Sequence, residues 1–280
     1  MTRALEVVSP GPLTTVQDAG RPGLAALGIG RSGACDRRAH ALANRLVGNP
    51  PGAAVLEVTF GALEVRARGD LLVATAGARC AGPWPHAAPS RLRDGELLRL
   101  GPPVTGVRTY VAVRGGLDVE PVLGSRSTDV LAALGPPVAA AGDVLPVGPV
   151  TGPLPGVDVA PVAEPPDGDV ALTVLPGPRR DWFDDAAWAQ LTSRWTVSST
   201  SNRVGLRLDG PPLTRTTQGE LASEGMVRGA VQVPPSGLPV LLLADSPVTG
   251  GYPVIAYVVD GDVDRAAQLR PGQGVRLGTT

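Results

Sequence analysis

Residues 241–259, LLLADSPVTGGYPVIAYVV, consist of two short apolar runs separated by a polar interruption. Both runs have the length of a strand and are rich in Leu, Val or Ile, which predicts two β-strands. The interruption holds an acid, two hydroxyl residues, a Gly-Gly pair, a Tyr and two prolines. Such a composition is typical of a tight hairpin between core strands. It is also compatible with a loop that presents a carboxylate and backbone amides to a small polar substrate.

The same pattern of short apolar runs separated by turn residues recurs along the rest of the chain. Short Val- and Leu-rich runs bounded by Gly, Pro or Asp-Gly predict strands, as in AVLEVTF, ALEVRAR and DLLVATAG of residues 54–77. Apolar spacing and capping residues predict helices only at residues 36–47, 184–193 and 262–270. Many strands with few helices favour mainly-β barrels or sandwiches over alternating βαβ units.

The domain organisation is suggested by a stretch rich in Pro, Gly and Val in the middle of the chain. We expect residues 1–150 to form an N-terminal β-barrel domain and residues 169–280 a C-terminal one. Residues 151–168 are predicted to link them.

Composition excludes several classes of function. The formal net charge is −1, so no basic excess indicates a nucleic-acid partner. No Lys occurs anywhere in the sequence, which excludes a Walker A lysine, a Schiff-base lysine and covalently attached biotin. Two distant cysteines and two histidines lack the spacing of a zinc site. Neither a signal peptide nor a membrane-spanning run is visible, which favours a cytoplasmic protein without membrane contacts.

Polar groups in four segments are candidates for binding or chemistry. Within GSRST, Arg126 follows Ser125 and can hold a carboxylate or phosphate, although an ordinary polar turn explains the pattern equally well. Arg203 lies in SNRVGLRL, where a solvated strand face is the alternative. Ser223 and Glu224 precede a Val-rich strand in which Gln232 stands between two valines.

The polar interruption adds the last candidates. Asp245 stands at the end of an apolar run, where acids commonly cap turns. The pair Gly250 and Gly251, followed by Tyr252, permits positive φ and a close approach of backbone amides to an anion. Considered without other information, this segment favours a hairpin over a site.

Taken together, the motifs resemble a known family. The stretches occur in the following order: SPGPLTTVQDAGRPG, SGACDRRAHALANRLVGNP, LEVTFG, GGLDVEPVLGSRSTD, LPGPRRDWF, SEGMVRGAVQVPPSGLPVLLLAD and TGGYPVIA. They resemble the biotin-dependent carboxyltransferase family, also called allophanate hydrolase subunit 2. Its free-standing bacterial members are called the 5-oxoprolinase C subunit or kinase-inhibitor antagonist. The chain has Pro247 and Val248 where the family commonly has Gln and Thr.

The resemblance implies two cyclophilin-like β-barrel domains with a few short helices. It also implies two partners from the same 5-oxoprolinase, a kinase-inhibitor-like B subunit together with an A subunit. The three proteins open 5-oxo-L-proline to L-glutamate at the expense of ATP. We expect the ATP to be bound by or with a partner subunit. The substrates of the family share a small planar amide.

The residues then acquire expected roles. Asp245 is expected to accept the lactam N–H or move a proton, and Gln232 to act beside it. The substrate-binding residues are expected to be Gly250, Gly251, Tyr252, Ser223, Glu224, Arg203, Ser125 and Arg126. Two alternatives remain open: a regulatory protein that antagonises a kinase-inhibitor-like partner, and a carboxyltransferase component that acts on urea or a related amide with carboxybiotin from another protein.

Overall fold

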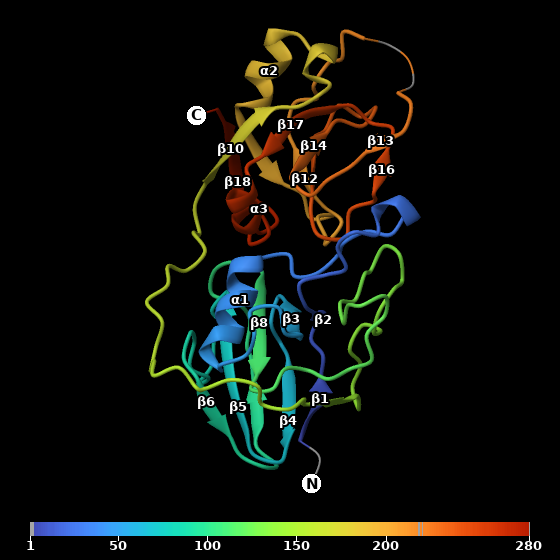
Figure 1. Ribbon diagram of the computed structural model, residues 1–280. Coiled ribbons are helices and arrows are strands. Elements are labelled where there is room, and N and C mark those ends of the chain that lie inside the picture. The colour runs from blue at the N-terminus through green and yellow to red at the C-terminus, as the bar shows by residue number, and fades with distance from the viewer. Residues whose placement is uncertain (1–2, 218, 220, 280) are drawn as a thin grey trace. The chain divides into compact units, whose positions relative to one another are not determined.

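The computed structural model describes residues 3–217, 219 and 221–279, and strands predominate in it, which confirms the mainly-β prediction (Figure 1). The chain forms two compact units. Unit 1 comprises Met1–Arg21 and Ser32–Pro165, and unit 2 comprises Pro22–Arg31 and Pro166–Thr280. The short segment Pro22–Arg31, which contains the 3-10 helix η1 (Ala25–Leu27), therefore belongs to the unit formed by the second half of the chain.

Unit 1 is built from two antiparallel sheets and one helix. The four-stranded sheet has the order β7-β4-β1-β9 and the five-stranded sheet the order β2-β3-β8-β5-β6. The elements are β1 (Ala4–Ser9), β2 (Leu13–Gln17), α1 (Arg37–Leu46), β3 (Val55–Thr59), β4 (Glu64–Arg68), β5 (Leu71–Gly77), β6 (Ser90–Leu92), β7 (Leu97–Arg99), β8 (Arg108–Val113) and β9 (Val144–Pro146).

Both faces of the five-stranded sheet are buried because the side chains alternate between two cores. Val111 and Val113 of β8 point into a core shared with the four-stranded sheet. Tyr110 and Ala112 point to the opposite face, where α1 packs (Figure 1). Helix α1 begins after Asp36, whose carboxylate accepts the N–H of Ala39 at 2.9 Å, and it lies within the predicted residues 36–47.

The segment predicted as a linker packs against unit 1 over most of its length. Residues 151–165 contain no helix or strand and are assigned to unit 1. Ala160 donates its N–H to Ala87 O at 2.8 Å, and Val157 and Ala160 pack beside the helix core. Arg114 donates to Gly152 O at 2.6 Å. These contacts fix the segment on a surface of unit 1.

Unit 2 contains a closed barrel with the strand order β10-β17-β14-β15-β12-β11-β18. The barrel closes where β10 pairs with β18 in parallel. The elements of this half are β10 (Val170–Pro176), η2 (Arg180–Trp182), α2 (Asp185–Leu191), β11 (Arg194–Val197), β12 (Gly205–Asp209), β13 (Glu224–Gly225), β14 (Ala230–Gln232), β15 (Val240–Leu242), β16 (Thr249–Gly250), β17 (Val254–Val258), α3 (Asp260–Ala266) and β18 (Gly274–Gly278).

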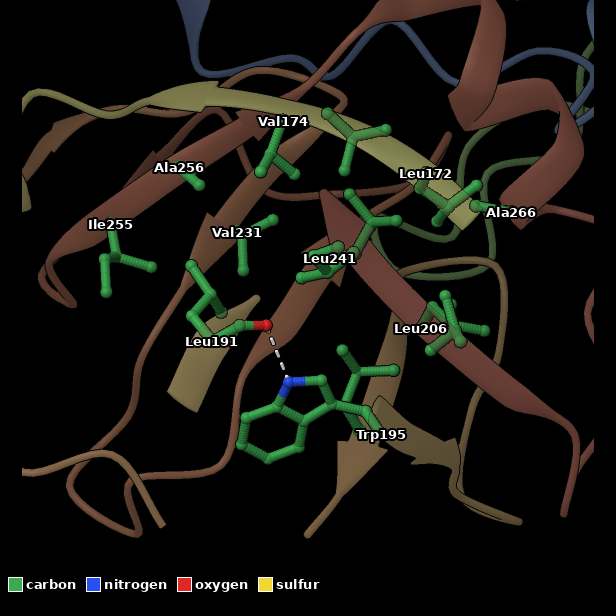
Figure 2. Packing of buried hydrophobic residues seen from close by; sticks show 14 of the residues in the cluster. Leu172, Val174, Leu191, Trp195, Leu206, Val231, Leu241, Ile255, Ala256 and Ala266 are labelled. Carbon is green, nitrogen blue, oxygen red and sulfur yellow. Dashed lines mark hydrogen bonds between the residues drawn. The ribbon is translucent and has the colours of Figure 1, made fainter. Parts of the chain in front are cut away.

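The barrel interior is filled mainly by Val, Leu and Ile around a single buried tryptophan. Trp195 is 1% exposed, and its indole Nε1 donates to Leu191 O at 2.8 Å (Figure 2). The indole therefore fastens the last turn of α2 to the barrel core. Helix α3 begins at Asp260, two residues before the predicted start (262 − 260), and α2 lies inside the predicted residues 184–193.

Over the described part of the chain, no helix is both long and apolar enough to cross a membrane.

Candidate functional site

The two apolar runs of residues 241–259 do not form a hairpin. The first contains β15 and the second β17, and in the barrel β14 lies between them. The connection between the runs therefore has to cross the end of β14. Along this crossover the chain forms β16, which pairs with β13 outside the barrel ladder. The hairpin alternative is wrong, and the polar interruption is a crossover loop.

The crossover begins with a buried ion pair between Asp245 and Arg203. The guanidinium is bidentate, with Nε donating to Oδ2 at 2.8 Å and Nη2 donating to Oδ1 at 2.9 Å. Both residues are 1% exposed, and Asp245 N also donates to Arg203 O at 3.1 Å. A carboxylate held in this way extends the pairing of β12 with β15. Both of its oxygens already accept hydrogen bonds from the Arg203 guanidinium.

Gln232 lies on the outer face of the barrel, as the alternating pattern predicts. Its neighbours Val231 and Val233 are fully buried in the barrel interior. Gln232 pairs across the ladder with Val240 and Val254, and a register shift separates it from Val231. Its side-chain amide makes no hydrogen bond to the residues that the structure describes. A half-buried amide of this kind can both donate to and accept from a ligand.

A short ribbon of β13 and β16 covers the same outer face. Glu224 pairs with Gly250, and Met226 N donates to Val248 O at 2.8 Å. The Met226 side chain packs into an apolar cluster with Ala230, Val240, Leu242 and Val254. Two of those residues are the ladder partners of Gln232, so the predicted residues of this ribbon and Gln232 share one face of the barrel.

The two glycines have close neighbours, and neither Gly250 nor Gly251 has a positive φ. A Cβ on Gly250 would lie 3.2 Å from Met226 Cε and Cγ. A Cβ on Gly251 would lie 3.3 Å from Leu221 O. Gly251, Tyr252 and Ser223 are exposed, so this end of the ribbon is open to solvent.

Arg179 contacts the predicted residue Glu224, and the sequence reasoning did not single it out. Its guanidinium forms a bidentate pair with the carboxylate of Glu224, through Nε at 3.2 Å and through Nη2. Its backbone N donates to Val254 O at 3.0 Å, which places it beside the ladder partner of Gln232. The signal in the sequence was the Arg-Arg pair after the Pro-Gly-Pro turn, in a motif that carried only the family resemblance.

Arg215 is a second residue that the sequence reasoning missed. Its Nη2 donates to Val233 O, and its Nε is buried without a hydrogen-bond partner in the described part of the chain. Burial lowers the pKa of the Arg215 guanidinium, and the neighbouring Tyr252 partly offsets this shift. A half-buried guanidinium beside an exposed phenol is suited to bind a carboxylate.

Ser125 and Arg126 belong to unit 1, whereas the other eight predicted residues belong to unit 2. Ser125 Oγ donates to Asp18 Oδ1 and Arg126 N to Asp18 Oδ2, each at 2.6 Å. The Arg126 side chain donates to Val119 O and to Asp118 Oδ1, each at 2.7 Å. These bonds fold the GSRST turn around Asp18. They satisfy the groups that we predicted to hold a substrate anion.

The outer face of unit 2 thus carries the half-buried amide of Gln232 and the exposed phenol of Tyr252, with the half-buried Arg215 beside Tyr252. Together these groups can recognise a planar amide that also carries a carboxylate. The Arg179–Glu224 pair borders this arrangement and holds the ribbon that covers it.

Comparison with known proteins identifies the family to which the chain belongs. Residues 27–279 match the family model of the carboxyltransferase domain, subdomains A and B. The chain therefore belongs to the carboxyltransferase domain family.

Particular relatives sharpen the comparison. The chain is 40% identical to the C subunit of 5-oxoprolinase from Escherichia coli over 98% of its own length and 90% of that protein. It is 32% identical to urea amidolyase of Lachancea kluyveri, covering 98% of the chain but 17% of that protein. Among solved structures, the protein TTHA0988 superposes with a TM-score of 0.90 at 38% identity, covering 99% of this chain and 56% of that one. The chain thus spans about half of that structure's length and a small part of the amidolyase.

Proposed function

We propose that the chain is the C subunit of an ATP-dependent 5-oxoprolinase, which opens 5-oxo-L-proline to L-glutamate together with its A and B subunits. The observation that carries the proposal is the 40% identity to a 5-oxoprolinase C subunit over nearly the full length of both proteins. The polar face of unit 2 supports it, because its amide, guanidinium and phenol groups complement a lactam that bears a carboxylate. ATP is bound by or with one of the partner proteins, and the chain acts within the complex.

In this proposal the Gln232 amide contacts the lactam edge. A lactam presents its N–H and C=O side by side, and a primary amide can accept from the first while donating to the second. Arg215 binds the substrate carboxylate, and Tyr252 together with the amides of Gly250 and Gly251 closes the site. Asp245 and Arg203 are positioning residues that fix the start of the crossover, in place of the direct contacts first expected of them.

The test is reconstitution of the three subunits with ATP and 5-oxo-L-proline, with glutamate formation as the readout. We expect glutamate only when this chain is present. Gln232→Ala should lower kcat/KM about tenfold or more, because it removes two hydrogen bonds to the substrate. Gln190→Ala is the matched control, since Gln190 is a half-buried glutamine of the same unit in α2. Equal turnover with and without this chain would refute the proposed function.

A carboxyltransferase component is the second candidate. The observation that favours it is the 32% identity to a protein named urea amidolyase. In that case the chain would transfer a carboxyl group to urea or a related amide from carboxybiotin on another protein. Adding avidin to the assay separates the two candidates, because it would abolish a biotin-dependent reaction and leave ATP-driven lactam opening unchanged.

A further inference from the structure

A hollow of about 360 Å³ in unit 1 is lined by arginine side chains that the proposed function does not use. Its lining includes Arg3, Arg91, Arg93 and Arg114 with a single acid, Asp70. The carboxylate of Asp70 accepts the N–H of Asp94 at 2.9 Å, so it is already engaged in a turn. We call this hollow the arginine pocket. Its volume is within the range of small-molecule sites.

Two of these guanidinium groups are held in place by hydrogen bonds to backbone carbonyl oxygens. Arg114 donates from Nη1 to Val47 O at 2.8 Å and from Nη2 to Gly152 O at 2.6 Å. Arg3 donates from Nη2 to Gly148 O at 2.7 Å. Carbonyl acceptors orient a guanidinium without neutralising its charge. These two arginines therefore supply a fixed positive potential to the pocket.

The other two guanidinium groups are exposed and available. Arg91 lies in β6 and Arg93 follows it, so alternation directs both side chains away from the buried Leu92. Neither side chain has an ion pair or hydrogen bond within the described part of the chain. The two like charges repel each other, and a bound anion would relieve that repulsion.

The pocket also has an apolar side. Val150 and Leu154, from the segment that packs on unit 1, line it and are 45% and 51% exposed. A ligand that fits both sides carries a multiply charged anion and a less polar body. A phosphate group brings up to two negative charges and three acceptor oxygens, which suits several guanidinium groups better than one carboxylate does.

We propose that the arginine pocket binds the phosphate group of a small organic phosphate, with the body of the ligand against Val150 and Leu154. The inference does not rest on the proposed 5-oxoprolinase function, since the site lies wholly within unit 1 and binding is measured on this chain alone. Failure of one proposal therefore leaves the other intact.

The experiment is calorimetric titration of the full chain with ATP, inorganic tripolyphosphate and adenosine. ATP and tripolyphosphate should bind, with an affinity that falls as salt is added, and adenosine should not. ATP should bind more tightly than tripolyphosphate, because its body adds contacts with the apolar side. Equal binding of the two would overturn the placement of the ligand body against Val150 and Leu154.

The double variant Arg91→Gln/Arg93→Gln should weaken the binding of both phosphates about tenfold or more, because it removes two charge-assisted contacts. Its melting temperature should not fall, since these side chains make no hydrogen bond or ion pair to lose within the described part of the chain. Arg207→Gln is the matched control, an exposed arginine on strand β12 of unit 2. Absence of phosphate binding at millimolar ligand, or equal weakening in the control and the double variant, would overturn the proposal.

Discussion

Replacing Asp245 by Asn should lower the stability of unit 2 whether or not partner proteins are present. The carboxylate and the Arg203 guanidinium are each 1% exposed and are joined by two hydrogen bonds of 2.8 and 2.9 Å. Asn removes the negative charge while leaving the cation buried. Removing one partner of a buried pair costs about 3–5 kcal/mol, which is a large share of the stability of an ordinary domain.

The corresponding fall in melting temperature is about 10 °C or more for a unit of this size. Scanning calorimetry and urea unfolding of the isolated chain measure it. Asp209→Asn is the control, because Asp209 is exposed at the end of the neighbouring strand β12. That change should alter the unfolding free energy by less than about 0.5 kcal/mol.

A double-mutant cycle isolates the ion pair from the other contacts of the two residues. Arg203→Met combined with Asp245→Leu removes both charges, so its cost should be smaller than the sum of the two single changes. Strictly additive costs would contradict the reasoning. So would an Asp245→Asn variant as stable as the Asp209→Asn control that nonetheless lost activity in the complex, because that result would return Asp245 to a catalytic role.

Three further predictions concern other parts of the chain. Trp195→Phe removes the bond to Leu191 O and leaves a void, and urea unfolding should show a loss of about 2–3 kcal/mol. Burial lowers the pKa of His40 from 6.5, so as the pH falls the unfolded chain takes up the imidazole proton before the folded chain does. The free energy of unfolding should therefore decrease as the pH drops below 6.5. His40→Gln should reduce that decrease when unfolding is measured as a function of pH. Gly250→Val drives a side chain against Met226. We expect a clear rise in KM with only a small fall in melting temperature, and kinetics and calorimetry on one preparation would measure both.

Local patterns predicted the parts of this structure that depend on local physics. The helices α1 and α2 lie within the residues predicted for them, because apolar spacing and capping act along a single element. The Arg203–Asp245 pair joins residues 42 positions apart, and the sequence contains 25 basic and 26 acidic residues. No rule of spacing selects one partner from so many, because the choice depends on which strands become neighbours.

The same limit explains the misplaced hairpin. A polar interruption with Gly and Pro between two apolar runs identifies a chain reversal, but it does not show whether another strand lies between the runs. That depends on the pairing of β14 with both β15 and β17, which the sequence of 241–259 does not contain. The catalytic expectation for Asp245 failed to foresee a buried partner for the same reason.

The crossover also explains how the altered residues Pro247 and Val248 are compatible with a working face. The contact that holds the loop at this point is the bond from Met226 N to the carbonyl oxygen of Val248, which any residue can supply. The preceding proline does not disturb it, because the acceptor is a backbone carbonyl. What the substitutions change is therefore the polarity beside the ribbon, and not its position over the barrel.

The double variant Pro247→Gln/Val248→Thr should accordingly change the KM for one planar amide relative to another without changing the melting temperature. A large shift in melting temperature would show that these two side chains hold the loop, contrary to this reasoning.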